Sequence, residues 1–185
     1  MTGVQTCALP ISTGPIIEAR ADPAAPATAQ TVQDATSATG QALARMQEID
    51  RNFDASRFLA GADQAFRMIV AAFAAGDRTT LRSLLGDETY AAFEQAISAR
   101  EKAGERQVTE IKAMQHLSID SAGLKGQVWQ VTARIVSDQV SYTQDKDGRP
   151  LTGTDAVTEI TDLWTFERDL SQQDPTWRLV AARSG

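Results

Sequence analysis

Three polar side chains of the sequence have the chemistry of an acid–base site. His116 is the only histidine, and an imidazole exchanges protons near neutral pH. Asp162 and Arg168 lie six residues apart in an alternating run, so in a strand they share one face. Burial in an apolar cavity raises the pKa of a carboxyl group toward useful values. A small-molecule-binding protein or isomerase-like enzyme, in which these three groups meet in a cavity, is therefore an open alternative.

The same three residues also have an ordinary structural explanation. A lone histidine without a neighbouring carboxylate motif more often packs in a fold or lies on its surface. Asp162 and Arg168 are equally suited to be hydrogen-bonded structural groups or ions at a cavity rim. The only cysteine is Cys7, and no cluster of metal ligands is visible. We therefore predict no catalytic residue, no metal and no cofactor.

Large apolar side chains on the expected helices and strands have two explanations. They either line a pocket for an acyl chain or another apolar ligand, or they fill the core. The candidate pocket-lining residues are Phe66, Phe73, Phe93, Trp129, Ile160, Trp164, Phe166 and Trp177.

Helices are expected in the first half of the chain, ahead of the strands. An apolar stripe of helical spacing predicts a helix over residues 55–75, with Asp54 as its N-cap and Gly76 after its end. Two further helices are predicted over residues 79–85 and 88–103, each introduced by a Gly-Asp pair. These helices need a sheet against which to bury their apolar faces.

Period-two alternation begins after residue 104 and predicts four strands. The first two cover residues 108–119 and 128–142, and a hairpin follows over residues 160–166 and 177–181, after an exposed turn at 145–154. The apolar face of the second strand changes phase near Ile135 and Val136, which predicts a β-bulge there. The expected fold is α+β, with the helices on the concave face of a bent four-stranded antiparallel sheet, forming a cone.

The N-terminal segment carries little folding information. Residues 1–11, including Cys7, resemble the translated read-through of a sequencing-library adapter. Residues 12–49 are rich in Ala and Pro and are expected to be a linker, with a short helix over residues 41–49. We expect that the natural N-terminus, with any signal or membrane anchor, is missing.

Charge and hydropathy exclude some function classes. The 185 residues carry a net charge of −6 and no basic stripe, which argues against nucleic-acid binding. No uninterrupted apolar run approaches the length of a membrane span, the longest being residues 68–75. The segment itself is therefore expected to be soluble.

Several short runs resemble a known family. They lie at residues 53–54, 58–62, 65–66, 71–77, 84–85, 162–169 (DLWTFERD), 174–175 and 177–179 (WRL), with single matches at Tyr90, Phe93, Arg100, Gly104 and Val157. In these runs residues 50–185 are similar to the Tim-44-like domain, named for the 44-kilodalton subunit of the mitochondrial inner-membrane translocase, and look most like its alphaproteobacterial adaptor branch. The resemblance implies a nuclear-transport-factor-2-like cone.

The same resemblance implies a non-catalytic, membrane-associated adaptor, related to protein translocation, at a bacterial inner membrane. Its expected partners are a membrane-complex protein, anionic lipid or both. Members of the family carry a membrane anchor and an Ala/Pro-rich linker before the domain, and this sequence shows only the linker. The segments with which the mitochondrial relative docks a chaperone are not matched, so the resemblance does not extend to chaperone binding.

Overall fold

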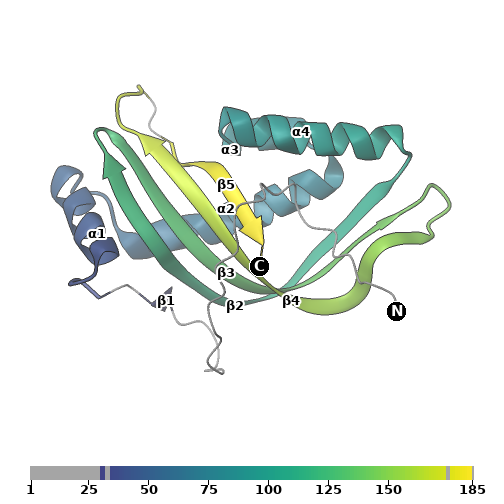
Figure 1. Cartoon of the computed structure of the whole chain (residues 1–185), viewed down its shortest axis with the longest axis horizontal. Helices are drawn as coiled ribbons and strands as arrows, with labels where there is room; N and C mark the ends of the chain where they lie inside the picture. Colours follow the sequence, from purple (N-terminus) through teal and green to yellow (C-terminus); the bar gives the residue numbers. More distant parts are fainter. Residues whose placement is uncertain (1–29, 32–33, 174–175, 185) are drawn as a thin grey trace.

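The computed structural model describes residues 30–31, 34–173 and 176–184. Residues 1–11 and most of the expected linker lie outside the described part. The elements are β1 (Gln30–Thr31), α1 (Ala38–Ile49), α2 (Ala55–Ala75), α3 (Arg78–Leu84), α4 (Asp87–Lys102), β2 (Arg106–Lys125), β3 (Val128–Gln144), β4 (Pro150–Asp169) and β5 (Arg178–Ser184). Figure 1 shows the long strands curving beneath α2 and α4.

Local capping explains where the helices begin and end. The Asp54 carboxylate accepts a hydrogen bond from the backbone N–H of Arg57 at 2.7 Å, which satisfies a free donor in the first turn of α2. Gly76 ends α2 in a left-handed conformation with φ of 71°. Asp77 then caps α3 by accepting from the N–H of Thr80 at 3.1 Å. The three predicted helices are confirmed to within one residue at each end.

Replacing the α2 cap is expected to lower stability measurably. Asp54→Ala leaves the Arg57 N–H without its acceptor, and we expect the free energy of unfolding to fall by about 1 kcal/mol. Asp54→Asn keeps the acceptor oxygen and is the control, expected to stay within a few tenths of a kcal/mol of the parent. Urea denaturation of the three proteins measures this, and equal losses in both variants would contradict the capping role.

The strands form one sheet in the order β1–β2–β3–β4–β5. Strands β2 to β5 are antiparallel neighbours, which confirms the predicted four-stranded sheet. The two-residue β1 adds a short parallel pairing with Leu117 and Ser118 on β2. Strand β4 also begins earlier than expected, at Pro150, within the segment that was predicted to be an exposed turn.

The predicted bulge at Ile135 and Val136 is wrong in position. These residues pair in continuous register with Asp162 and Thr161 on β4. The irregularities lie instead on β2, where Gln115 is an extra residue opposite this point, and on β3 and β4 beyond Gln139. The prediction failed because β3 keeps the same face buried beyond Ile135. The buried residues on that face change there from apolar to polar, namely Ser137 and Gln139.

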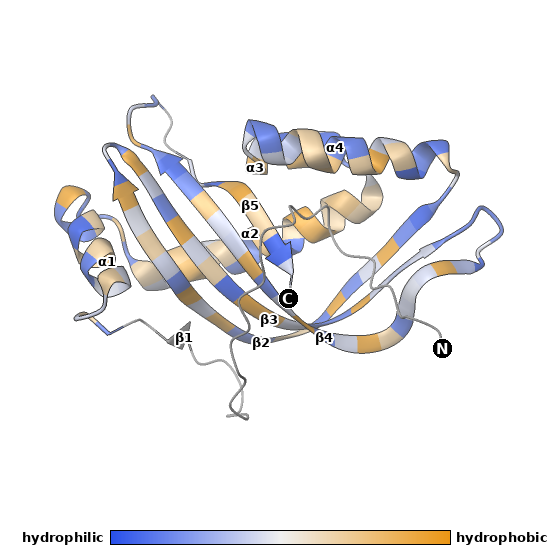
Figure 2. Cartoon of the chain, viewed as in Figure 1, coloured by the Kyte–Doolittle hydropathy of each residue, from blue (hydrophilic) through white to orange (hydrophobic). Residues whose placement is uncertain are grey.

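The core lies between α2 and the concave face of the sheet. Helix α2 buries eight side chains, and β3 and β4 contribute fully buried Trp129 and Trp164. Figure 2 shows the apolar colouring of α2 along the sheet and the polar colouring of much of α4. This arrangement confirms the α+β fold with helices packed on a bent antiparallel sheet.

Helix α1 joins this core. Its Leu43 and Met46 are 7% and 0% exposed, and the helix lies against β2. Ser37 caps it by accepting from the N–H of Gly40 at 3.0 Å. The expected short helix is therefore present and begins at Ala38, whereas the domain boundary at residue 50 stays a prediction.

Candidate functional site

A pocket of about 450 Å³ lies beside the first four turns of α2. One wall is α2, and the other is formed by the end of β4, Trp177 and Leu84 of α3. The residues that line it are Asn52, Phe53, Asp54, Arg57, Phe58, Gly61, Ala62, Gln64, Ala65, Met68, Leu84, Phe166, Arg168 and Trp177. The lining is therefore mainly apolar, with a small number of polar groups.

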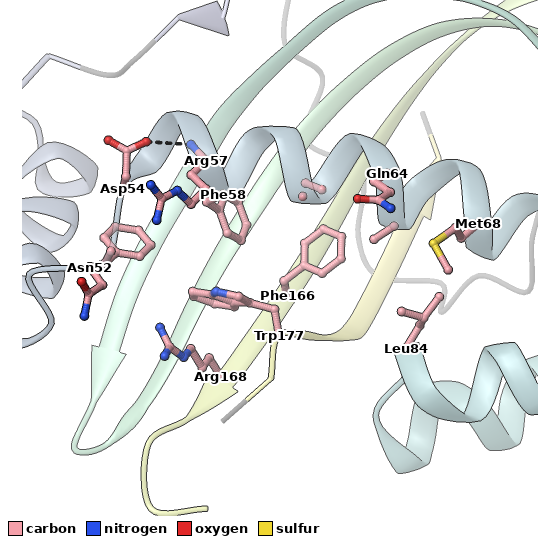
Figure 3. A pocket seen from close by; sticks show the side chains of 14 residues that line it. Asn52, Asp54, Arg57, Phe58, Gln64, Met68, Leu84, Phe166, Arg168 and Trp177 are labelled. Atoms are coloured by element: carbon pink, nitrogen blue, oxygen red, sulfur yellow. Dashed lines mark hydrogen bonds between the residues drawn. The ribbon is translucent and has the colours of Figure 1, made fainter. Parts of the chain in front are cut away.

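The pocket has a polar end and a mainly apolar end. Figure 3 shows Asn52, Asp54, Arg57 and Arg168 at one end, with Met68, Leu84 and the uncharged Gln64 at the other. The rings of Phe58, Phe166 and Trp177 lie between the two ends. An elongated ligand with one polar terminus matches this distribution.

Edge-to-face ring contacts hold the aromatic wall in place. The Phe58 ring lies 4.9 Å from that of Trp177 and 5.8 Å from that of Phe166, both in T-shaped geometry. Phe53 links Trp177 to the buried Trp129, at centroid distances of 6.3 Å and 5.7 Å. Such contacts favour fixed ring orientations, so the wall is pre-formed rather than assembled around a ligand.

The two arginines at the polar end differ in their surroundings. The Arg168 guanidinium donates to the Asp50 carboxylate at 3.2 Å and lies 5.8 Å from the centre of the Trp129 ring. It therefore ties the end of β4 to the segment that joins α1 and α2. Arg57 is exposed, and no carboxylate among the described residues forms an ion pair with its side chain. Arg57 is the cation available to a ligand.

Gly61 occupies an unusual place in this lining. It lies in the middle of α2, and a Cβ atom built on it meets nothing within 4 Å. Neither a positive φ nor close packing requires glycine here, although glycine inside a helix costs about 1 kcal/mol relative to alanine. The fold alone therefore does not explain this residue.

We expect Gly61→Ala to stabilise the protein. The gain is about 0.5–1 kcal/mol in the free energy of unfolding, because the methyl group has open space and alanine favours the helix. Thermal or urea denaturation measures it. A destabilised Gly61→Ala protein would show that the fold itself needs this glycine.

The apolar residues predicted to line a pocket separate into three groups. Phe166 and Trp177 line the pocket, and Arg168, predicted as a polar rim group, lies with them. Ile160 is half-buried on β4 beside Ser137 of β3. The others are buried in the core at 6% exposure or less: Phe66, Phe73, Phe93, Trp129 and Trp164.

Asp162 is buried away from this pocket, with 2% of its surface exposed. Its carboxylate accepts hydrogen bonds from the Ser184 hydroxyl and from Gln139, whose amide also donates to the Ser137 hydroxyl at 2.9 Å. Burial raises the pKa of Asp162 to about 6, although both hydrogen bonds act in the opposite direction. Asp162 is therefore a structural carboxyl group whose hydrogen bonds are made, but burying its charge costs stability.

His116 lies on the opposite face of the sheet from Asp162. It pairs with Val136, which pairs with Thr161, whereas Asp162 pairs with Ile135 in the next row. The sequence alternation places His116 on the face of Met114, but the extra residue Gln115 reverses the alternation between them.

The structure therefore does not bring the three candidate polar groups together. Asp162 and Arg168 share a face of β4 but are six residues apart, which is about 20 Å along a strand. Of the three, Arg168 alone lines the pocket. Within the described ranges no group of His, Cys, Asp or Glu side chains is placed to hold a metal ion.

Sequence reasoning missed most of the site, because only Phe166, Arg168 and Trp177 of its fourteen lining residues were candidates. Asn52, Phe53, Arg57, Gly61 and Met68 line the pocket, but none was a candidate. Gly61 was the available signal, because an internal glycine in an otherwise apolar helix calls for an explanation.

Helix α2 also has the length and composition of a membrane-crossing segment. Its most apolar 18-residue window has a mean hydropathy of 1.3, and 44% of that window is buried in this fold. It is the one such helix in the described part of the chain. Because the apolar face of α2 holds the core, this length and composition are weak evidence for a span.

Comparison with known proteins identifies the family. A family model described as the Tim44-like domain matches residues 39–184. No curated protein matches the chain. Among solved structures, the intermembrane space region of chloroplast protein ARC6 is similar with a TM-score of 0.51 and 14% identity, covering 72% of this chain and 97% of that one.

A second structure, an NTF2-like family protein from Streptomyces avermitilis, has a TM-score of 0.41 and 12% identity, covering 70% of this chain and 95% of that one. The likeness to ARC6 at this identity concerns the fold. The family match covers more than two thirds of the sequence, including α1 to β5. The chain belongs to the Tim44-like domain family.

Proposed function

We propose that this chain is the folded domain of a non-catalytic adaptor, which holds a partner protein or lipid at a bacterial inner membrane. The observation that carries the proposal is the pre-formed apolar pocket beside α2, with an available cation at one end. Membership of the Tim44-like family supports the same role. The only titratable side chains in the lining are Asp54, Arg57 and Arg168, and these do not form an acid–base pair.

The alternative of an isomerase-like enzyme loses the feature that motivated it. His116 lies on the opposite face of the sheet from Asp162, and Arg168 lies six residues along β4 from Asp162. Asp162 keeps a raised pKa, but its carboxylate is engaged by Ser184 and Gln139 and does not line the pocket. A binding function therefore accounts for the pocket better than a reaction does.

Detergent-free membrane flotation and pull-down of the full-length protein test the adaptor proposal. We expect the protein to float with inner-membrane vesicles and to retain a protein or lipid after washing. Failure in both assays would overturn the proposal. Turnover of a small molecule, abolished by substitution of Asp162, would favour the enzyme instead.

A further inference from the structure

We propose that the pocket, with the exposed face of α2 beside it, docks an amphipathic helix of a partner protein that places an acidic side chain on Arg57. This inference rests on the proposed function and names the kind of partner that the adaptor holds. It is argued from the shape of the pocket, from Gly61 and from charge.

The pocket follows one face of a helix over four turns. Its α2 lining falls at residues 54, 57–58, 61–62, 64–65 and 68, which is the repeat of a single helical face. These fifteen positions span about 21 Å at about 1.5 Å per residue. A partner helix of similar length can lie along this face and insert apolar side chains at i, i+3 or i+4, and i+7 into the pocket.

The floor of the pocket is made of small residues at its centre. Gly61, Ala62 and Ala65, together with the exposed Gln64, lie between the larger Phe58 and Met68. Small side chains allow two helices to approach closely, and Gly61 has open space where its side chain would be. An approaching helix gives a physical reason for a glycine that the fold does not require.

Charge sets the direction and the chemistry of the partner. Arg168 on β4 already contacts Asp50, and Arg67 on α2 pairs with Asp63 at 2.9 Å. Arg57 is left as an exposed cation at the polar end, beside the ring of Phe58. An acidic side chain near one end of the docked helix would complete the ion pair and set the orientation.

A protein segment fits this surface better than a bilayer does. Interfacial helices are rich in Lys and Arg on their polar face, whereas α2 has Arg57 and Arg67 against Asp63, and the whole chain carries −6. A second copy of this chain also fits poorly. Antiparallel pairing of two α2 helices centred on Gly61 would place Arg57 opposite Ala65, and the nearest acid, Asp63, already pairs with Arg67.

The test places a photoreactive residue in the groove of the full-length protein. Met68, which is 42% exposed, is replaced by p-benzoylphenylalanine in the cells that make the protein. The control position is Arg134, which is exposed on the face of β3 opposite to the core. After irradiation, mass spectrometry identifies the crosslinked peptide. That segment is then synthesised, and its affinity for the purified protein is measured.

The expected result is a Met68-specific adduct within a segment of helical periodicity that carries an acidic residue. Arg57→Glu should weaken binding of the synthetic peptide at least tenfold, and changing the acid of the peptide to Lys should restore it. Arg67→Glu is the matched control on α2, with less than a threefold effect. A lipid adduct, an adduct with this same chain, no adduct, or an unrescued Arg57→Glu would overturn the helix proposal.

These outcomes separate the two proposals. A protein adduct at Arg134 alone would leave the adaptor function standing and remove the groove from it. A lipid adduct at Met68 would likewise keep membrane association while excluding the helix. Loss of flotation and pull-down, in contrast, would remove the adaptor function itself.

Discussion

Asp162→Asn is expected to make the protein more stable at neutral pH. The folded protein raises the pKa of this carboxyl from its ordinary 3.8 to about 6, mainly by burial. The folded state therefore binds the proton more tightly than the unfolded state, and stability falls as pH rises through the interval between these two values. That difference in pKa corresponds to a ceiling of about 3 kcal/mol above pH 6.

The asparagine removes the charge but keeps one acceptor oxygen for Ser184 or Gln139. Its amide group replaces the second oxygen, so we expect a net gain of about 2 kcal/mol at pH 8. Near pH 3.5 the carboxyl is protonated in the folded state and mostly protonated in the unfolded state, so the charge no longer matters and the gain should turn into a loss of up to about 1 kcal/mol. Urea denaturation of both proteins across pH 3.5 to 8 measures the difference.

Asp155→Asn, at an exposed position of the same strand, controls for the loss of one negative charge. A stability gain for Asp162→Asn that does not change with pH would show that ionisation of the Asp162 carboxyl is not its cause. A loss of stability at pH 8 would mean that the charged form is favoured by its hydrogen bonds.

Trp164→Ala is expected to cost about 4 kcal/mol in the free energy of unfolding. The ring is fully buried on β4, 4.7 Å from that of Phe66 on α2, so it joins the sheet to the central helix. Removing it deletes a large apolar surface and leaves a cavity in the middle of the core. A loss of this size is a large part of the stability of an ordinary domain.

Trp164→Phe separates ring packing from hydrogen bonding. The indole N–H has no hydrogen-bond partner among the described residues, so phenylalanine removes an unsatisfied donor while keeping an aromatic ring. We expect a loss of about 1 kcal/mol, measured by urea denaturation beside the alanine variant. Equal losses in the two variants would show that the indole itself, rather than an aromatic ring, is required.

The sequence predicted the fold well because its local signals agree. Asp54, Gly76 and Asp77 mark helix ends through short-range hydrogen bonds and backbone conformation, which depend on neighbouring residues alone. Strand irregularities were less predictable. Gln115 is an extra residue only relative to its partner strand, and the face of His116 depends on that pairing.

The site was only partly predictable, because a pocket is space that is left unfilled. Phe166 and Trp177 are aromatic, as Trp164 is, and periodicity cannot tell a ring in a pocket wall from a ring in the core. Asp162 and Arg168 were correctly placed on one face, but the length of β4 separates their surroundings. Arg168 contacts Asp50 in the segment that joins α1 and α2, whereas Asp162 is enclosed by Ser184 of β5 and Gln139 of β3.

The most direct measurement compares two tryptophan substitutions on adjacent residues of α2. Gly61→Trp fills the pocket from its open side, whereas Ala60 is exposed and not part of the lining, so Ala60→Trp is the matched control. Both full-length variants are crosslinked in the membrane, and the co-purifying protein or lipid is quantified. The pocket account predicts at least a tenfold loss for Gly61→Trp and full retention for Ala60→Trp. Equal retention in both variants would contradict it.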